Sequence, residues 1–110
     1  MVLLTTLKKG SMSVGNHYDD RFLSPQRLQW QSQSRTTQAS RHGQILSGKL
    51  PSHRVHLLVR SEKLRGNTAA PFLYIGVPRF AGWHGEAPIT IDWDLPSAVP
   101  QHFRKMLRVP

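Results

Sequence analysis

Apolar residues alternate with polar ones most clearly near the end of the chain, between Ile89 and Leu95. Side chains of a strand point alternately to its two faces, so this segment predicts a strand with one buried face. The side chains expected to face the core are Ile89, Ile91, Trp93 and Leu95. Arg54–Arg60 shows the same period, and there we expect Val55, Leu57 and Val59 to point inward.

Two further apolar segments, Val2–Leu7 and Phe72–Val77, predict strands. Gly76 within the second indicates a bulge or a close approach of another chain segment. Glu62–Ala70 predicts a charged turn around Gly66-Asn67. Phe80–Pro88, which contains two glycines, predicts a turn region.

Helix signals are fewer. Ser24 before Pro25 is typical of a helix N-cap, and we expect a short helix from Pro25 to about Gln29. A terminal helix is expected within Ser97–Leu107. The remaining segments predict irregular structure: a loop at Ser11–Asn16, an edge strand or extended loop at Gln31–Thr37, and a mobile loop within Gln38–Ser52.

Short strands at short spacing predict a mainly β fold with minor α content. We expect a small barrel-like or strongly curled antiparallel or mixed sheet of about five to seven strands, with one or two short helices. The 110 residues are expected to form a single domain, residues 1–110.

Composition narrows the class of protein. The chain has no cysteine, which excludes disulfides, a thiol nucleophile and Cys-ligated zinc. It has no apolar run near the roughly 18 residues of a membrane helix, and its first residues do not resemble a signal peptide. We therefore expect a soluble, cytoplasmic protein.

Positive charge is strongly segregated. The formal net charge is +9, and no acidic residue occurs between Asp20 and Glu62. Arginine outnumbers lysine, and its planar guanidinium matches phosphate oxygens and guanine edges. A basic protein of this kind is expected to bind a polyanion, and nucleic acid is the partner that the charge favours.

The segment Leu28–Thr37 combines a tryptophan, three glutamines, several hydroxyls and an arginine. Tryptophan can stack on a base, and glutamine and arginine can pair with base edges. For Trp30 a role as core anchor competes with base stacking, and the usual burial of tryptophan favours the core. The expected nucleic-acid contacts are Trp30, Gln31, Gln33, Ser34 and Arg35, supported by Lys8, Arg21, Arg41, His42 and Arg60.

A catalytic constellation is not visible, so we expect a protein that is not an enzyme and needs no cofactor or metal. A metal-dependent nuclease using Asp92, Asp94 and Glu86 is the weakest alternative. The competing interpretation places Asp92 and Asp94 on the solvent face of their strand, paired with Arg79 or Arg104.

Segments spread over roughly Leu3 to Pro100 resemble the bacterial domain of unknown function 3427. One of them is Leu28–Ser34, and the Trp-Gln-Ser-Gln block within it, residues 30–33, is the most specific element. The others are Leu4–Lys8, Tyr18–Pro25, His56–Arg60, Pro71–Gly76 and Pro88–Leu95. That domain typically lies C-terminal to DEAD/DEAH-type helicase modules, sometimes with a phospholipase-D-like nuclease. The resemblance implies an accessory DNA-handling module in restriction, repair or phage defence. It implies no catalytic residue, and the chain carries no helicase motif, so it is either a stand-alone copy or an excised domain.

Together these features predict a non-catalytic DNA-binding module that positions or recruits a helicase or nuclease. The defence context adds the expectation that the module reads modified DNA. The alternative from another class is a protein-interaction module, in which the apolar strands and Trp83 dock onto a partner enzyme.

Overall fold

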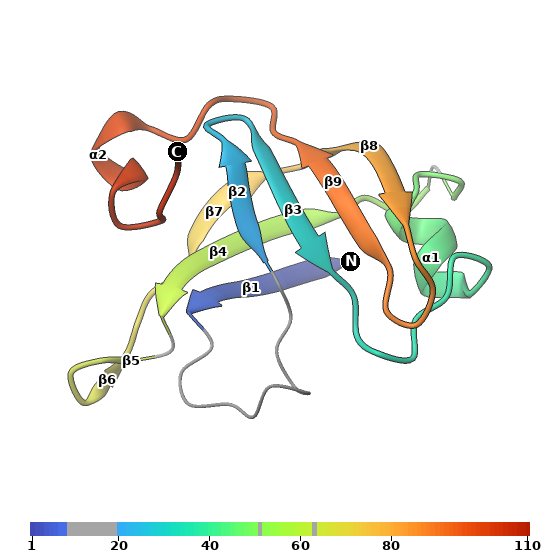
Figure 1. Cartoon of the computed structure of the whole chain (residues 1–110), viewed down its shortest axis with the longest axis horizontal. Coiled ribbons are helices and arrows are strands. Elements are labelled where there is room, and N and C mark those ends of the chain that lie inside the picture. The colour runs from blue at the N-terminus through green and yellow to red at the C-terminus, as the bar shows by residue number, and fades with distance from the viewer. Residues whose placement is uncertain (9–19, 51, 63) are drawn as a thin grey trace.

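The computed structural model describes residues 1–8, 20–50, 52–62 and 64–110, and strands dominate it (Figure 1). Within these residues the strands are β1 (Val2–Lys8), β2 (Arg21–Ser24), β3 (Arg27–Gln31), β4 (His56–Glu62), β5 (Leu64–Arg65), β6 (Thr68–Ala69), β7 (Leu73–Gly76), β8 (Arg79–His84) and β9 (Thr90–Asp94). The helices are α1 (Arg41–Leu46) and α2 (Gln101–Arg104). None of the described helices has the length and apolar character to cross a membrane.

The strands form two sheets and a small ribbon. β2, β3, β9 and β8 make an antiparallel sheet in that order. β1, β4 and β7 make a mixed sheet, in which β1 runs parallel to β4 and β7 runs antiparallel to it. The strands of the larger sheet cross those of the smaller one steeply (Figure 1). The predicted mainly β class with two short helices is confirmed, although neither sheet closes into a barrel.

The core lies between the two sheets. All four apolar residues predicted to face inward from β9 and its flanks are buried, as are Val55, Leu57 and Val59 around β4. They belong to one apolar cluster that also includes Leu28 of β3 and Leu107 near the C-terminus. The period-2 patterns therefore predicted the buried faces of both sheets correctly.

The helix expected at Pro25–Gln29 is wrong. Pro25 and Gln26 form the turn of a hairpin between β2 and β3. The backbone N–H of Gln26 donates to the Ser24 hydroxyl at 3.3 Å, a local bond that serves a turn as well as a helix cap. Pairing of β3 with β9 buries Leu28 completely, and this tertiary gain outweighs the local helix signal.

Two other segments also differ from expectation. Phe80–Pro88, predicted as a turn, contains most of β8, because pairing with β9 accommodates Gly82 at a shift in register. The segment Gln38–Ser52, expected to contain a mobile loop, also contains α1. The segment Gln31–Thr37, expected as an edge strand or an extended loop, is loop after Gln31, which confirms the second alternative. The terminal helix is confirmed only as α2, which covers four residues.

Other local predictions are confirmed. β5 and β6 form a hairpin around Gly66-Asn67. Gly76 lies at a register shift between β4 and β7 with φ +112°, and a Cβ there would lie 3.0 Å from the Pro96 ring. The loop expected at Ser11–Asn16 lies outside the described residues.

Candidate nucleic-acid interface

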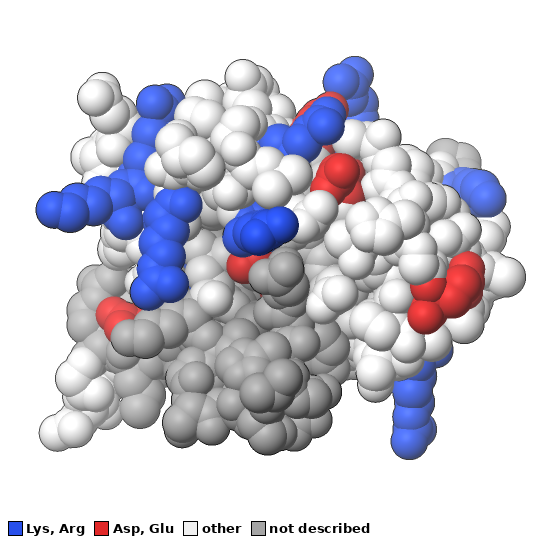
Figure 2. All heavy atoms as spheres, in the orientation of Figure 1, with Lys and Arg blue, Asp and Glu red and all other residues white. Residues whose placement is uncertain are grey.

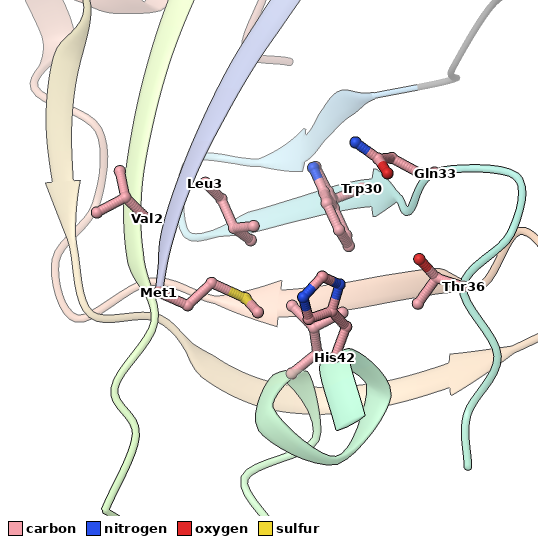
Figure 3. Close-up of a pocket in the computed structure, with 8 residues that line it drawn as sticks. Met1, Val2, Leu3, Trp30, Gln33, Thr36 and His42 are labelled. Carbon is pink, nitrogen blue, oxygen red and sulfur yellow. The ribbon is translucent and has the colours of Figure 1, made fainter. Parts of the chain in front are cut away.

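A hollow of about 270 Å³ opens where the start of β1, strand β3 and helix α1 meet (Figure 3). We call it the Trp30 hollow. Its lining residues are Met1, Val2, Leu3, Trp30, Gln33, Thr36, His42 and Leu46. It is the place where the structure brings together three residues predicted to contact nucleic acid, Trp30, Gln33 and His42.

Trp30 belongs both to the core and to the wall of this hollow. On β3 it pairs with Ile91 of β9, and its half-buried ring packs against the core cluster. The ring projects from β3 toward His42 of α1 (Figure 3). The two interpretations of Trp30 are therefore compatible, because one part of the indole is packed and another borders the hollow.

The Trp-Gln-Ser-Gln block is not one contact surface, because strand alternation divides it. Gln31 lies on the opposite face of β3 from Trp30, where its Nε2 donates to Thr90 Oγ1 at 3.4 Å. Ser32 is buried, and its Oγ accepts from the backbone N–H of Ile89 at 2.9 Å. Gln33 is exposed and lines the hollow.

Helix α1 positions His42. The Ser40 hydroxyl caps the helix by accepting from the Gly43 N–H at 3.1 Å. A Cβ at Gly43 would overlap the carbonyl oxygens of Thr37 and Gln38, so only glycine lets α1 approach this loop so closely. The sequence signal for α1 was Ser40 before a short segment ending in Ile45 and Leu46, but the two glycines nearby obscured it.

Sequence reasoning missed some of the lining residues. Thr36 comes from the loop after β3, which is fixed by the bond from the Ala87 N–H to the Thr36 carbonyl at 3.0 Å. Leu3 of β1 and Met1, which precedes that strand, lie more than 25 residues away along the chain from Trp30. No local pattern predicts this proximity, since it arises from the packing of the two sheets.

Two arginines, Arg35 and Arg41, are sequence neighbours of residues that line the hollow. Arg35, with its neighbour Ser34, is exposed in the loop between Gln33 and Thr36. Arg41 is exposed next to His42, and its Nη2 lies 3.3 Å from His53 Nε2. In the part of the chain that the structure describes, neither arginine has a carboxylate partner.

The other predicted basic contacts lie elsewhere. Arg60 donates to Thr6 Oγ1 at 2.9 Å and lies 4.3 Å from the centre of the Phe72 ring. Lys8 ends β1, about 20 Å from its first residue at ~3.3 Å per residue. Arg21 is exposed on β2, opposite Gln29.

The positive side chains visible in Figure 2 gather at the end that carries α2, and single ones lie apart across the rest of that face. The ten predicted contact residues do not form one patch, because Gln31 lies on the opposite face of β3 from Trp30 and Arg60 is held by Thr6 and Phe72. Those around the Trp30 hollow form a group of their own, namely Trp30, Gln33, Ser34, Arg35, Arg41 and His42.

Each of the three acids in the nuclease hypothesis has hydrogen-bond partners of its own. Asp94 accepts from Arg27 at 2.8 Å and from Arg79 at 3.5 Å, which confirms the predicted pairing with Arg79. Hydrogen bonding by Arg27 lowers the pKa of Asp94. Asp92 accepts from Gln29, and Glu86 from the backbone N–H of Gln38. Among the described residues no three His, Asp or Glu side chains are grouped to hold a metal ion.

Comparison with protein-family models gives a match over most of the chain. A family model described as a domain of unknown function (DUF3427) matches residues 1–107. No curated protein matches the chain. The match covers both sheets and the Trp30 hollow, and its description names no activity.

Proposed function

This chain belongs to the DUF3427 family of domains of unknown function, and from this premise we propose that it is a non-catalytic DNA-binding module. It binds through the surface around the Trp30 hollow. In the setting that the family resemblance implies, it positions or recruits a helicase or nuclease on DNA, including modified DNA.

The observation that supports the proposal best is the chemistry around the hollow. An aromatic wall, Trp30, lies beside the exposed polar side chains of Gln33 and His42. The exposed Arg35 and Arg41 flank these residues and have no carboxylate partner among the described residues. Stacking surface, hydrogen-bonding groups and phosphate-binding cations are the three components of single-strand and base recognition.

A salt titration tests this proposal. Binding of fluorescent DNA, single-stranded and duplex, is measured by anisotropy between about 50 and 200 mM salt. We expect the double variant Arg35→Gln/Arg41→Gln to bind more weakly. The slope of log affinity against log salt should fall by about 0.7–0.9 for each lost phosphate contact.

The matched control is Lys105→Gln/Arg108→Gln, which removes the same charge at two exposed positions that follow α2, outside this surface. It should change the slope much less. Equal effects of the two double variants would mean that net charge alone attracts DNA. Absence of binding at the lowest salt would refute the proposal.

A second candidate function, protein docking, is favoured by exposed apolar side chains on the smaller sheet. Val2 and Leu4 are 60% and 61% exposed, and Tyr74 is 55% exposed. Leu4 and Tyr74 flank Leu58 in the register of the sheet, so they share its outer face. Trp83, expected at such an interface, is instead half-buried, with Lys49 Nζ 5.6 Å above its ring and Phe80 against its edge.

The two candidates separate in one binding assay with a DEAD/DEAH-type helicase module as the probe. If the sheet face docks to it, Leu4→Lys/Tyr74→Lys should abolish complex formation in analytical ultracentrifugation, while Arg35→Gln/Arg41→Gln should leave it intact. No complex with the unmodified chain would argue against docking to this type of helicase module.

A further inference from the structure

The Trp30 hollow has the features of a pocket for a single flat ring. We propose that it receives one unpaired nucleobase of the bound DNA. This inference rests on the proposed DNA-binding function and assigns a ligand to its central cavity.

Trp30 forms the aromatic wall of the hollow. Its backbone pairs with Ile91 of β9 and its indole packs against the core cluster, so the ring is restrained before any ligand arrives. A fixed aromatic face binds a base at little cost in side-chain entropy. Met1 and Leu3 add an apolar border on the β1 side (Figure 3).

Polar side chains form the rim of the hollow. Gln33, Thr36 and His42 line it, and within residues 1–8, 20–50, 52–62 and 64–110 the side chains of all three lack a hydrogen-bond partner. An amide, a hydroxyl and an imidazole offer both donors and acceptors. The edge of a nucleobase presents the same mixture of donors and acceptors, so these groups can pair with it.

The size of the hollow and the charges near it also fit a nucleobase. A volume of about 270 Å³ lies just below the range of about 300–1,000 Å³ for pockets that hold drug-sized ligands, which suits one ring system rather than an extended molecule. Arg35 and Arg41 adjoin the rim residues in the chain and are exposed, so their cations are accessible to phosphates of the bound strand.

Removing the bases while keeping the phosphates tests this inference. The probes are a thymidine octamer and an octamer of the same length whose residues are abasic. The unmodified protein should bind the thymidine strand about 5- to 140-fold more tightly, the range expected for one stacked base. Trp30→Leu should remove this preference and Trp30→Phe should restore much of it, with thermal unfolding used to verify that both variants fold.

A matched pair of glutamine variants tests the polar rim of the hollow. Gln33→Ala should reduce the preference for the thymidine strand, whereas Gln26→Ala, an exposed glutamine in the β2–β3 turn, should not. Arg35→Gln/Arg41→Gln should weaken binding of both octamers alike, because both carry phosphates.

Two further probes identify the source of the base. Tighter binding of the single strand than of a matched duplex would indicate a base from single-stranded DNA. Tighter binding of a duplex with one mismatched thymidine than of the matched duplex would indicate a base turned out of a helix. Either result supports the inference.

Equal binding of the thymidine and abasic octamers would overturn the inference and leave the proposed DNA-binding function standing. No binding of any DNA at low salt would overturn both.

Discussion

Ser32 and Ser34 lie two positions apart in the most unusual segment of the sequence, and the fold gives them opposite environments. Ser32 is 1% exposed, whereas Ser34 is exposed in the loop beyond β3. The Ser32 hydroxyl accepts from the Ile89 N–H and donates to the Gln33 carbonyl at 3.0 Å. Its role is therefore to join the end of β3 to the residue that precedes β9.

Ser32→Ala should lower the free energy of unfolding by about 1–3 kcal/mol, because it leaves the buried N–H of Ile89 without its hydroxyl acceptor. Ser34→Ala should change it by less than about 0.5 kcal/mol. Urea denaturation of both variants measures the difference. Equal effects would contradict the structural role of Ser32.

Asp94 makes stability depend on pH. The Arg27 guanidinium, helped by Arg79, holds the pKa of this carboxyl below its ordinary value of 3.8. A lowered pKa in the folded state favours folding at pH values above 3.8, and this contribution disappears as the pH falls through the folded-state pKa. Asp94→Asn should therefore lower the urea midpoint at neutral pH and have little effect well below pH 3.8.

Arg27→Gln provides the control for this pH dependence, since it removes the main cause of the lowered pKa. In the Arg27→Gln background, Asp94→Asn should cost less stability at neutral pH than it does alone. The stability cost of Asp94→Asn could instead be the same at neutral and at low pH, or the same with and without Arg27→Gln. Either result would contradict the assignment of this pH dependence to the Arg27–Asp94 pair.

At the scale of elements, the contact between α1 and the loop after β3 shapes the Trp30 hollow. Gln44 Nε2 donates to the Gln38 carbonyl at 2.9 Å, and Gly43 allows the backbones to touch. His42 on α1 and Thr36 on the loop face the same hollow, so the spacing of these two elements sets its width.

Gly43→Ala should destabilise the protein by about 1–3 kcal/mol, even though alanine favours a helix over glycine by about 1 kcal/mol. The added methyl overlaps two backbone carbonyls that cannot rotate away. Arg41→Ala, at an exposed position of the same helix, should be close to neutral. A stabilising effect of Gly43→Ala in thermal denaturation would show that the backbone of α1 is not in tight contact with the loop after β3.

At the scale of the molecule, both sheets contribute to one core. Leu57 of β4 and Ile91 of β9 belong to the same buried cluster, and each is fully buried. Loss of packing in one sheet should therefore weaken the other, and unfolding should be a single cooperative event.

Leu57→Ala should cost about 2–5 kcal/mol, a large part of the roughly 5–15 kcal/mol that stabilises a typical domain. Leu4→Ala, on the exposed face of the same sheet, should cost less than about 0.5 kcal/mol. Tryptophan fluorescence and far-UV circular dichroism should give coincident transitions for both variants. Separate transitions would indicate that the sheets unfold independently.

The strands with a clear apolar period could be predicted from the sequence by itself, because alternation reports directly which side chains leave water. Val55, Leu57 and Val59, and the four inward residues around β9, all follow this rule. The segregation of positive charge and the absence of cysteine are likewise properties of the sequence alone.

Only the tertiary structure decided what pairing and packing control. Local signals favoured a helix at Pro25–Gln29 and a turn at Phe80–Pro88, but pairing with β9 made Arg27–Gln29 and Phe80–His84 parts of strands. The same pairing turned Trp30 and Gln31 to opposite faces. The Trp30 hollow exists because the packing of the two sheets and α1 brings distant residues together. The free energy gained by this packing depends on the whole fold, so no local sequence pattern encodes it.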